Sequence, residues 1–227
     1  MKIGIIVAME KELEQLLTIV EDMKKESHGG KTYATGRVGN NEVVIQQSGI
    51  GKVNAAIGAV EMLNAYTPDI LVSTGVAGGA DTSLEVGNVV VGNAYCYHDA
   101  YCGEECAKGQ ILGQPARYVC KEQLVDKALS LKCNTKVRSG LIVSGDWFVD
   151  SREKMRSILD DFAEAMAVDM ESCALAQTCH IYDTPFVSFR IISDIPLKDH
   201  KAQMYFDFWK RMAEGSFEVT KAFLAAL

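Results

Sequence analysis

Proline and basic residues are both scarce in this chain of 227 residues. Its four prolines stand singly, and no repeat, low-complexity tract or Pro/Gly/Ser-rich linker divides it, so the sequence predicts one domain over residues 1–227. Its 23 Lys and Arg face 30 Asp and Glu, a formal net charge of -7. This balance argues against nucleic acids and acidic membrane surfaces as partners, but it leaves small molecules without phosphate open.

The chain also lacks a long hydrophobic run. No stretch approaches the roughly 18 apolar residues of a membrane span. The apolar run at residues 3–9 is followed at once by Glu10, Lys11 and Glu12 rather than by a small-residue cleavage site. We therefore expect neither a membrane span nor a targeting segment.

The seven cysteines are an odd number and are scattered, which favours reduced thiols in the cytoplasm over a disulfide framework. Cys102 and Cys106, with His98 nearby, have the spacing of half a zinc site, but no second pair at ligand spacing follows. The sequence thus predicts a cytoplasmic protein without a bound metal.

With 48% hydrophobic residues the chain is able to bury a sizeable core, and its apolar pattern alternates between strand and helix. The predicted strands are 2–8, 32–38, 42–48, 69–75, 88–96, 137–144, 165–168 and 186–192; the predicted helices are 13–23, 53–63, 120–131, 152–162, 171–182 and 203–226. In the helix at 53–63, the predicted apolar face consists of Val53, Ala56, Ile57, Val60 and Leu63. The alternation indicates the α/β class, with a mixed, mostly parallel central sheet flanked by helices.

Ligand sites of such folds lie beyond the carboxyl ends of strands, where several acidic residues of this chain fall. Asp194 ends an apolar strand, and a carboxyl group in apolar surroundings tends to stay protonated and to act as an acid. Glu171 is the first residue of a predicted helix. Its negative charge suits stabilisation of the helix end, and the sequence favours this role and a functional role equally. Glu12 follows the first strand. The topology predicts that all three meet at one edge of the sheet.

The glycine-rich segments do not match a nucleotide-phosphate loop. Residues 49–52 (GIGK) differ from G-x-x-x-x-G-K-[ST], and residues 75–79 (GVAGG), predicted as a turn, differ from G-x-G-x-x-G. Tight turns between strands and helices are the simpler explanation. Binding of a nucleotide phosphate is therefore not expected.

Six segments in order, the last two taken together, resemble the 5′-methylthioadenosine/S-adenosylhomocysteine nucleosidases of the nucleoside phosphorylase superfamily. They are residues 3–12 (IGIIVAMEKE), 48–56 (SGIGKVNAA), 73–79 (STGVAGG), 140–148 (GLIVSGDWF), and 167–172 (AVDMES) together with 190–194 (RIISD). These segments extend from the first predicted strand to the last. The resemblance implies the three-layer fold of that superfamily and a hydrolase that acts in methionine salvage.

The resemblance also implies a mechanism for cleaving the bond between adenine and ribose, without a cofactor. Asp194 would protonate N7 of the leaving purine, and Glu12, with Arg190 nearby, would activate the attacking water. Glu171 would accept hydrogen bonds from the ribose hydroxyls and stabilise the sugar cation. An acid at the leaving group and a base at the water are the logic of glycoside hydrolysis.

For substrate binding, the resemblance implies that Phe148 stacks on adenine and that the backbone of Val149 reads its edge. Met170 would pack beside the sugar, and Leu112 would cover the 5′ end from the neighbouring subunit of a homodimer. The other binding residues that the resemblance implies are Met9, Ile50, Val76, Ala77, Gly78, Asp169, Ser193 and Phe206.

The chain departs from the family pattern at three places. Val76 stands where many relatives have Ser, Asp169 shortens the commoner Glu of a Glu-Met-Glu pattern, and the loop 198–208 aligns poorly. Two other enzyme activities remain alternatives: a phosphorylase, whose Arg and Ser phosphate ligands are missing from residues 73–76, and a futalosine-type hydrolase. A non-catalytic nucleoside sensor would require the loss of Glu12, Glu171 or Asp194, and all three are present.

Overall fold

The computed structural model describes residues 1–199, 204–205, 207–208 and 217–227. In chain order, its elements are β1 (Lys2–Val7), α1 (Glu10–Leu17), β2 (Glu21–His28), β3 (Lys31–Val38), β4 (Asn41–Gln47), α2 (Lys52–Tyr66), β5 (Ile70–Gly79), β6 (Val89–Tyr97), β7 (Tyr118–Val119), α3 (Glu122–Leu129), β8 (Val137–Ser144), α4 (Arg152–Asp161), β9 (Ala165–Asp169), α5 (Ser172–Ile181), β10 (Phe186–Asp194) and α7 (Glu218–Ala226). Among the described residues, no helix has the length and apolar character needed to cross a bilayer.

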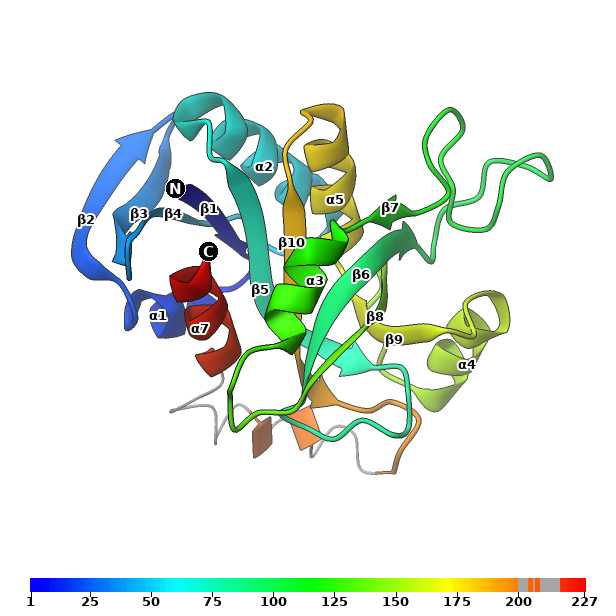
Figure 1. The fold of residues 1–227 in the computed structure, drawn as a ribbon. Helices are drawn as coiled ribbons and strands as arrows, with labels where there is room; N and C mark the ends of the chain where they lie inside the picture. Colours follow the sequence, from blue (N-terminus) through cyan, green and yellow to red (C-terminus); the bar gives the residue numbers. More distant parts are fainter. Residues whose placement is uncertain (200–203, 206, 209–216) are drawn as a thin grey trace.

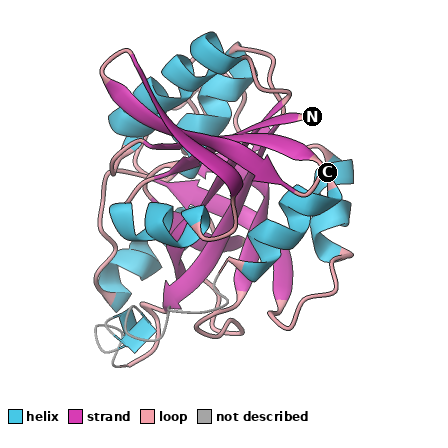
Figure 2. Ribbon diagram, turned by 90° about the vertical axis from the view of Figure 1, so that its left-hand side faces the viewer, coloured by secondary structure: helices cyan, strands magenta, loops and turns pink. Residues whose placement is uncertain are grey.

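A single mixed sheet runs through the molecule, with helices on both of its sides (Figures 1 and 2). Its strands follow the order β10-β6-β8-β9-β5-β1-β4-β3-β2, and β10 also pairs with β5. That extra pairing joins five strands into a closed ring, from which β1, β4, β3 and β2 extend. Parallel pairs such as β1 with β5 and β6 with β8 stand beside antiparallel pairs such as β10 with β6. The structure thus confirms the α/β class.

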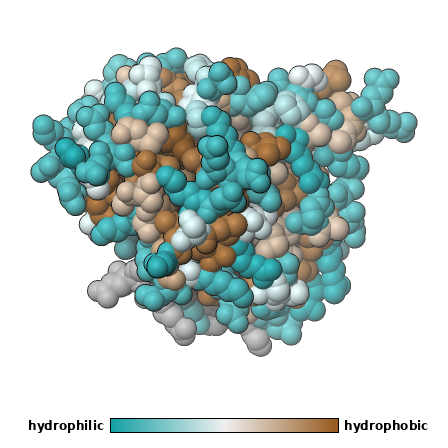
Figure 3. Space-filling model, viewed as in Figure 1, coloured by the Kyte–Doolittle hydropathy of each residue, from teal (hydrophilic) through white to brown (hydrophobic). Residues whose placement is uncertain are grey.

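The core follows from the apolar strands, which are covered on both faces. Every residue of β10 is buried, and β5 is buried along nearly its whole length. Burial on both faces is the usual setting of continuous apolar strands in α/β folds. On the face shown in Figure 3, hydrophilic residues cover most of the surface and hydrophobic residues gather in its central area.

The first predicted helix is shorter than expected. It ends at Leu17, and residues 21–28 form the edge strand β2 instead of a last helical turn and a loop. All eight residues of β2 are exposed, so no apolar alternation marks this strand in the sequence. Its hydrogen bonds to β3, which the sequence pattern does not reveal, determine its conformation.

Two further predictions were wrong in detail. Residues 75–79 form no turn but continue β5, because their backbones pair with β10 and β9. Only part of the predicted apolar face of α2 packs inward: Leu63 is buried, whereas Val53 is 69% and Ile57 46% exposed. The small residues Ala55, Gly58 and Ala59 face the protein instead, and they allow α2 to lie close to its neighbours. The predicted helix at 203–226 falls partly outside the described residues, and its described end is α7.

Candidate active site

One pocket opens at the strand ends where the acidic residues were predicted to meet. Segments that follow β1, β4, β8 and β9 and the ends of β5 and β10 form its wall. It is lined by Ala8, Met9, Glu12, Ile50, Val76, Ala77, Gly78, Trp147, Phe148, Val149, Val168, Asp169, Met170, Glu171, Ser193, Asp194 and Tyr205. The structure therefore brings together residues that are up to 197 positions apart, Ala8 and Tyr205, as the parallel strand ends predict.

Glu12 is held by backbone N–H groups from two segments. Its Oε2 accepts hydrogen bonds from the N–H groups of Ala8 (3.0 Å) and Met9 (2.9 Å), and its Oε1 accepts one from Val76 (3.0 Å). Burial raises the pKa of Glu12, while these donors and Arg190 counteract the rise. Gly75 permits this arrangement, because a Cβ atom there would stand 2.6 Å from Oε1.

Glu171 lies two residues after the end of β9 and points toward the start of α2. Its Oε1 accepts a hydrogen bond of 3.0 Å from the N–H of Gly51. Burial and the negative charge of Asp169 raise the pKa of Glu171 to about 7, although Arg190 and the Gly51 N–H favour the ionised form. A carboxyl group with a pKa in this range changes its charge near neutral pH.

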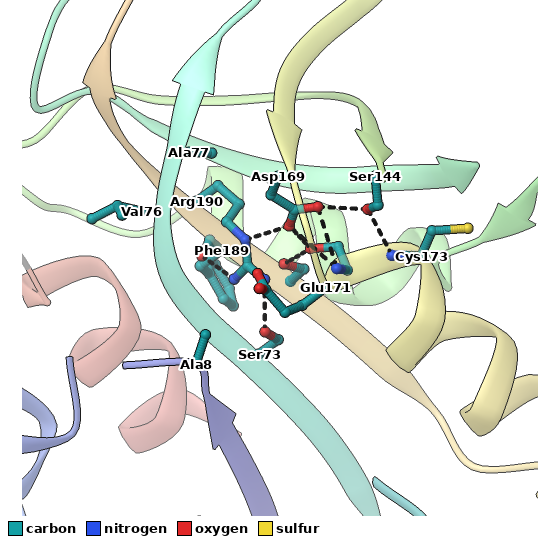
Figure 4. Close-up of polar contacts among 12 residues, drawn as sticks. Ala8, Ser73, Val76, Ala77, Ser144, Asp169, Glu171, Cys173, Phe189 and Arg190 are labelled. Carbon is teal, nitrogen blue, oxygen red and sulfur yellow. Dashed lines mark hydrogen bonds and ion pairs between the residues drawn. The ribbon is translucent and has the colours of Figure 1, made fainter. Parts of the chain in front are cut away.

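Arg190 and Asp169, which lines the pocket, form a buried ion pair (Figure 4). Arg190 donates through Nε to Asp169 Oδ2 at 2.6 Å and through Nη2 to Ser73 Oγ at 3.0 Å. Asp169 also accepts hydrogen bonds from the hydroxyls of Ser144 and Ser172. Burial lowers the pKa of Arg190, but the surrounding carboxylates raise it above its usual value, so the guanidinium stays charged.

A second, much smaller cavity of about 10 Å³ adjoins this group. Glu12, Glu171, Arg190 and Ser73 contribute to its wall. A cavity needs roughly this volume, and two to four polar partners, to hold one water molecule. The arrangement is therefore suited to holding a single water between two carboxylates and a guanidinium.

Asp194 ends β10 and is 5% exposed. The hydroxyl of Ser193 lies 2.8 Å from Asp194 Oδ1 and 3.3 Å from the carbonyl oxygen of Ala77. The pocket thus contains four carboxyl groups from different segments: Asp169 is paired with Arg190, and the other three are Glu12, Glu171 and Asp194. This is the combination that acid and base catalysis at one substrate requires.

The rest of the pocket wall is largely apolar and includes the aromatic side chains of Trp147, Phe148 and Tyr205. Phe148 meets Tyr205 edge to face at 6.0 Å between ring centroids, and Trp147 meets His98 in the same manner at 5.3 Å. Flat apolar surfaces of this kind suit a planar aromatic ligand. Sequence analysis missed Trp147, although it lies beside Phe148 in a segment that follows a predicted strand. It also missed Ala8 and Val168.

Three predicted site residues are not among the described residues that line the main pocket. Arg190 lines the small cavity rather than the main pocket. Leu112 is 71% exposed and is not part of the wall of the pocket in its own chain, whereas its neighbour Ile111 packs against the core. Phe206 lies outside the described residues.

No group of three or more His, Cys, Asp and Glu side chains in the described part of the chain is arranged to hold a metal ion. Among the described residues that line the two cavities, Arg190 is the cation, and it is engaged by Asp169 and Ser73. The end of β5 supplies Gly75 and Val76, which have no side-chain donor. A phosphate ion would therefore find few partners at this point.

These features define an α/β protein with a pocket that combines aromatic side chains and four carboxyl groups near its strand ends. The profile of the family described as the phosphorylase superfamily matches residues 2–226. The chain belongs to this family.

Relatives with stated activities resemble the chain over nearly all of its length. A 5′-methylthioadenosine/S-adenosylhomocysteine nucleosidase of Hydrogenovibrio crunogenus is 39% identical over 204 residues, 88% of each chain. The structure of the nucleosidase of that name from S. pneumoniae, bound to the transition-state inhibitor MT-ImmA, has a TM-score of 0.92 at 34% identity and covers 100% of this chain and 99% of that one. Futalosine hydrolase of Helicobacter pylori strain 26695 has a TM-score of 0.90 at 26% identity, with coverage of 100% and 98%.

Proposed function

We propose that this protein is a hydrolase that cleaves the N-glycosidic bond of 5′-methylthioadenosine and S-adenosylhomocysteine, giving adenine and the 5′-thioribose product. The observation that carries the proposal is the meeting of Glu12, Glu171 and Asp194 at one pocket with an aromatic wall. The Hydrogenovibrio relative with this activity in its name supports the choice of substrates.

Asp194 acts on the leaving group, adenine. Cleavage leaves electrons on adenine, and adenine departs readily only when its N7 receives a proton. Asp194 delivers that proton, while the Ser193 hydroxyl, 2.8 Å away, holds Oδ1 in place. A positioned general acid contributes about 10²- to 10⁴-fold to the rate. Phe148 stacks on the purine, and the backbone of Val149 contacts its edge.

The nucleophile is a water molecule activated by Glu12. The small cavity between Glu12, Glu171 and Arg190 supports this role, because a water held there would touch a base and a cation at once. The three backbone N–H groups fix the carboxylate so that it accepts the proton of the water without moving.

The developing sugar cation is stabilised by Glu171. Ionised Glu171 places negative charge beside the ribose and accepts hydrogen bonds from its hydroxyls, while Met170 packs against the ring. Met9, Ile50, Val76, Ala77 and Gly78 complete the wall around the sugar and the purine. Electrostatic stabilisation of this kind is strongest in a site that excludes water.

Water rather than phosphate is the proposed nucleophile, since the guanidinium of Arg190 is engaged by Asp169 and Ser73. Adenine release from 5′-methylthioadenosine, measured in buffers with and without phosphate, tests this choice. We expect equal rates and a free 5-thioribose product. An absolute need for phosphate, with accumulation of a ribose 1-phosphate, would show that the protein is a phosphorylase.

A futalosine-type hydrolase is the second candidate, because futalosine hydrolase of Helicobacter pylori has the same fold at 26% identity. The two activities share the glycosidic chemistry and differ in the 5′ group of the substrate. Parallel assays with methylthioadenosine and futalosine at equal concentration separate them. We expect methylthioadenosine to be the better substrate by kcat/KM.

We further propose that the enzyme is a homodimer in which the partner covers the 5′ end of the substrate. The exposed stripe of Val53, Ile57 and partly exposed Val60 on α2 is one reason, because large apolar groups at helical spacing favour a covered surface. The segment between β6 and β7, which carries exposed Leu112, extends away from the body of the molecule (Figure 1). Because this segment extends outward, it is well placed to contact a second subunit.

The proposed location is the cytoplasm. All seven cysteines are free, and burial raises the pKa of both Cys96 and Cys120 to about 12. Such thiols stay protonated, and it is the odd number of free cysteines without a disulfide framework that favours a reducing compartment. The proposed reaction needs no cofactor, because side chains of the protein and a water molecule carry out each step.

A further inference from the structure

Hydrogen bonds and an ion pair link three loops at Lys52, the first residue of α2. Its Nζ lies 2.9 and 2.8 Å from the two carboxylate oxygens of Asp99, which follows β6. Its backbone N–H donates to Asp146 Oδ1 at 2.9 Å, and Asp146, which follows β8, donates its own N–H to Asp99 Oδ2 at 2.9 Å. The loops after β4, β6 and β8 are thus tied into one unit.

This unit adjoins both Glu171 and the pocket. Gly51, directly before Lys52, is the residue whose N–H donates to Glu171. It adopts a φ of 94°, and a Cβ atom there would stand 3.0 Å from Asp146 Oδ1. Ile50 on one side of the unit and Trp147 on the other line the pocket. Any shift of the unit would therefore move a donor to Glu171 and two parts of the wall.

The contact between Lys52 and Asp99 is well shielded from solvent. The side chain of Asp99 is 8% exposed and that of Lys52 is 27% exposed. Lys52 Nζ also lies 5.3 Å from the centre of the Tyr97 ring and 3.7 Å from Asp146 Oδ2. Shielded pairs of this kind hold a defined geometry, whereas exposed pairs are weak and mobile.

We propose that Lys52 is a positioning residue for the reaction: through Asp99 and Asp146 it holds the Gly51 N–H on Glu171 and keeps Ile50 and Trp147 in register across the pocket. This role rests on the proposed function, because it assigns Lys52 to the group that stabilises the sugar cation. Lys52 itself lines neither of the two cavities.

The consequence for Glu171 has a definite direction. The charged groups that face it are Asp169, Arg190 and Glu12, and the Gly51 N–H is the backbone donor that favours its ionised form. If Lys52 is removed and this donor moves away, the pKa of Glu171 rises further above 7. Ionised Glu171 is then formed only at higher pH, so the acid limb of the pH–rate profile moves upward. The loss of one hydrogen bond to a charged group corresponds to about one pH unit.

If the ion pair only stabilised the fold, a variant with restored stability would also have the wild-type pH–rate profile. Removing Lys52 alone leaves the buried Asp99 carboxylate without its cation, which destabilises the fold by itself. The double variant Lys52→Met/Asp99→Asn removes both charges and restores stability, but it still lacks the bonds from Lys52 Nζ to Asp99. Lys31→Met is the matched control, because Lys31 pairs with Glu61 at 2.8 Å and is 31% exposed but lies away from the pocket.

The experiment compares the wild type, Lys52→Met, the double variant and Lys31→Met. Adenine release is measured from pH 5 to 9, and the amide signal of Gly51, recorded by NMR over the same range, follows the titration of Glu171 without any substrate. We expect the acid limb and the amide midpoint to rise by about one pH unit in both variants that lack Lys52. At pH 6 their kcat falls about tenfold, while Lys31→Met matches the wild type and Lys52→Arg recovers most of the loss.

The proposal is overturned if the double variant, folded as stably as the wild type, has the wild-type acid limb and Gly51 titration. It is also overturned if Lys31→Met shifts both readouts as far as Lys52→Met does. Failure of the proposed function is a separate result. A wild type that releases no adenine from methylthioadenosine would contradict the assigned activity, and the Gly51 titration would still decide the role of Lys52.

Discussion

Arg190 donates through Nε to Asp169 at 2.6 Å, and the two side chains are only 3% and 1% exposed. Asp169 lines the same pocket as Glu12 and Glu171, and Arg190 lines the small cavity that adjoins it. Its guanidinium balances carboxylates that would otherwise repel one another in a buried space. The same pairing leaves Arg190 poorly placed to bind a phosphate ion, so one contact influences both the stability of the site and the choice of nucleophile.

Asp169→Asn should be strongly destabilising, because it leaves the buried Arg190 without its closest negative partner. Removing one member of a buried ion pair costs about 3–5 kcal/mol. Urea denaturation at pH 7 measures the change. Asp161→Asn is the control, since Asp161 pairs with Lys108 on the surface at 3.4 Å, and it should cost less than about 1 kcal/mol. Equal losses in the two variants would contradict this account.

Asp194→Asn should lower kcat by about 10²- to 10⁴-fold, because Asn has no proton to deliver to the purine. The amide keeps the shape of the carboxyl group and still accepts the hydroxyl of Ser193, so adenine binding should persist. Steady-state kinetics and adenine titration by calorimetry check the two parts, with the exposed Asp126→Asn as control. A variant that retained more than about a tenth of the activity would remove Asp194 from the role of general acid.

Glu171→Gln should make stability less dependent on pH. In the folded protein the pKa of Glu171 is about 7, above the value of 4.5 for an unperturbed Glu. Between these values the folded state binds the proton that the unfolded state has released, so the free energy of unfolding falls as pH rises. Above pH 7 the whole loss is present, on the order of 3 kcal/mol at most.

The neutral side chain of Gln does not titrate, so the variant should gain stability relative to the wild type as pH rises from 5 to 8. Urea midpoints at several pH values measure this difference. Activity should be lost in the same variant, since Gln carries no charge for the sugar cation. A constant difference in stability across the pH range would show that Glu171 has an ordinary pKa.

Ile57→Lys should dissociate the proposed homodimer, because it places a charge on the exposed apolar stripe of α2. Sedimentation at assay concentration checks the oligomeric state, and the KM for methylthioadenosine should rise in the monomer as the cover of the 5′ end is lost. An active wild-type monomer would refute a pocket completed by the partner. A dimeric Leu112→Ser variant with unchanged kinetics would remove only Leu112 from that pocket.

Several elements could be predicted from the sequence because their signals are local. The strand at 137–144 was predicted with the bounds that β8 has, since an apolar run between polar loops indicates a buried strand. Strand β2 could not be predicted, because its eight residues are all exposed and mostly charged. The side of α2 that packs inward was also hidden, since Ala55 and Gly58 are small, whereas the larger Val53 and Ile57 suggested the opposite face.

The sequence by itself determined the α/β class, the family and the three carboxylates at strand ends, because alternating apolar segments and short motifs are read along the chain. Tertiary structure alone decided which groups touch them. Gly51 and Glu171 are 120 positions apart, yet one donates to the other; Asp169 pairs with Arg190, and Trp147 joins the wall of the pocket. Such contacts depend on how strands and loops pack in space, and this packing is determined by the whole core rather than by any one segment.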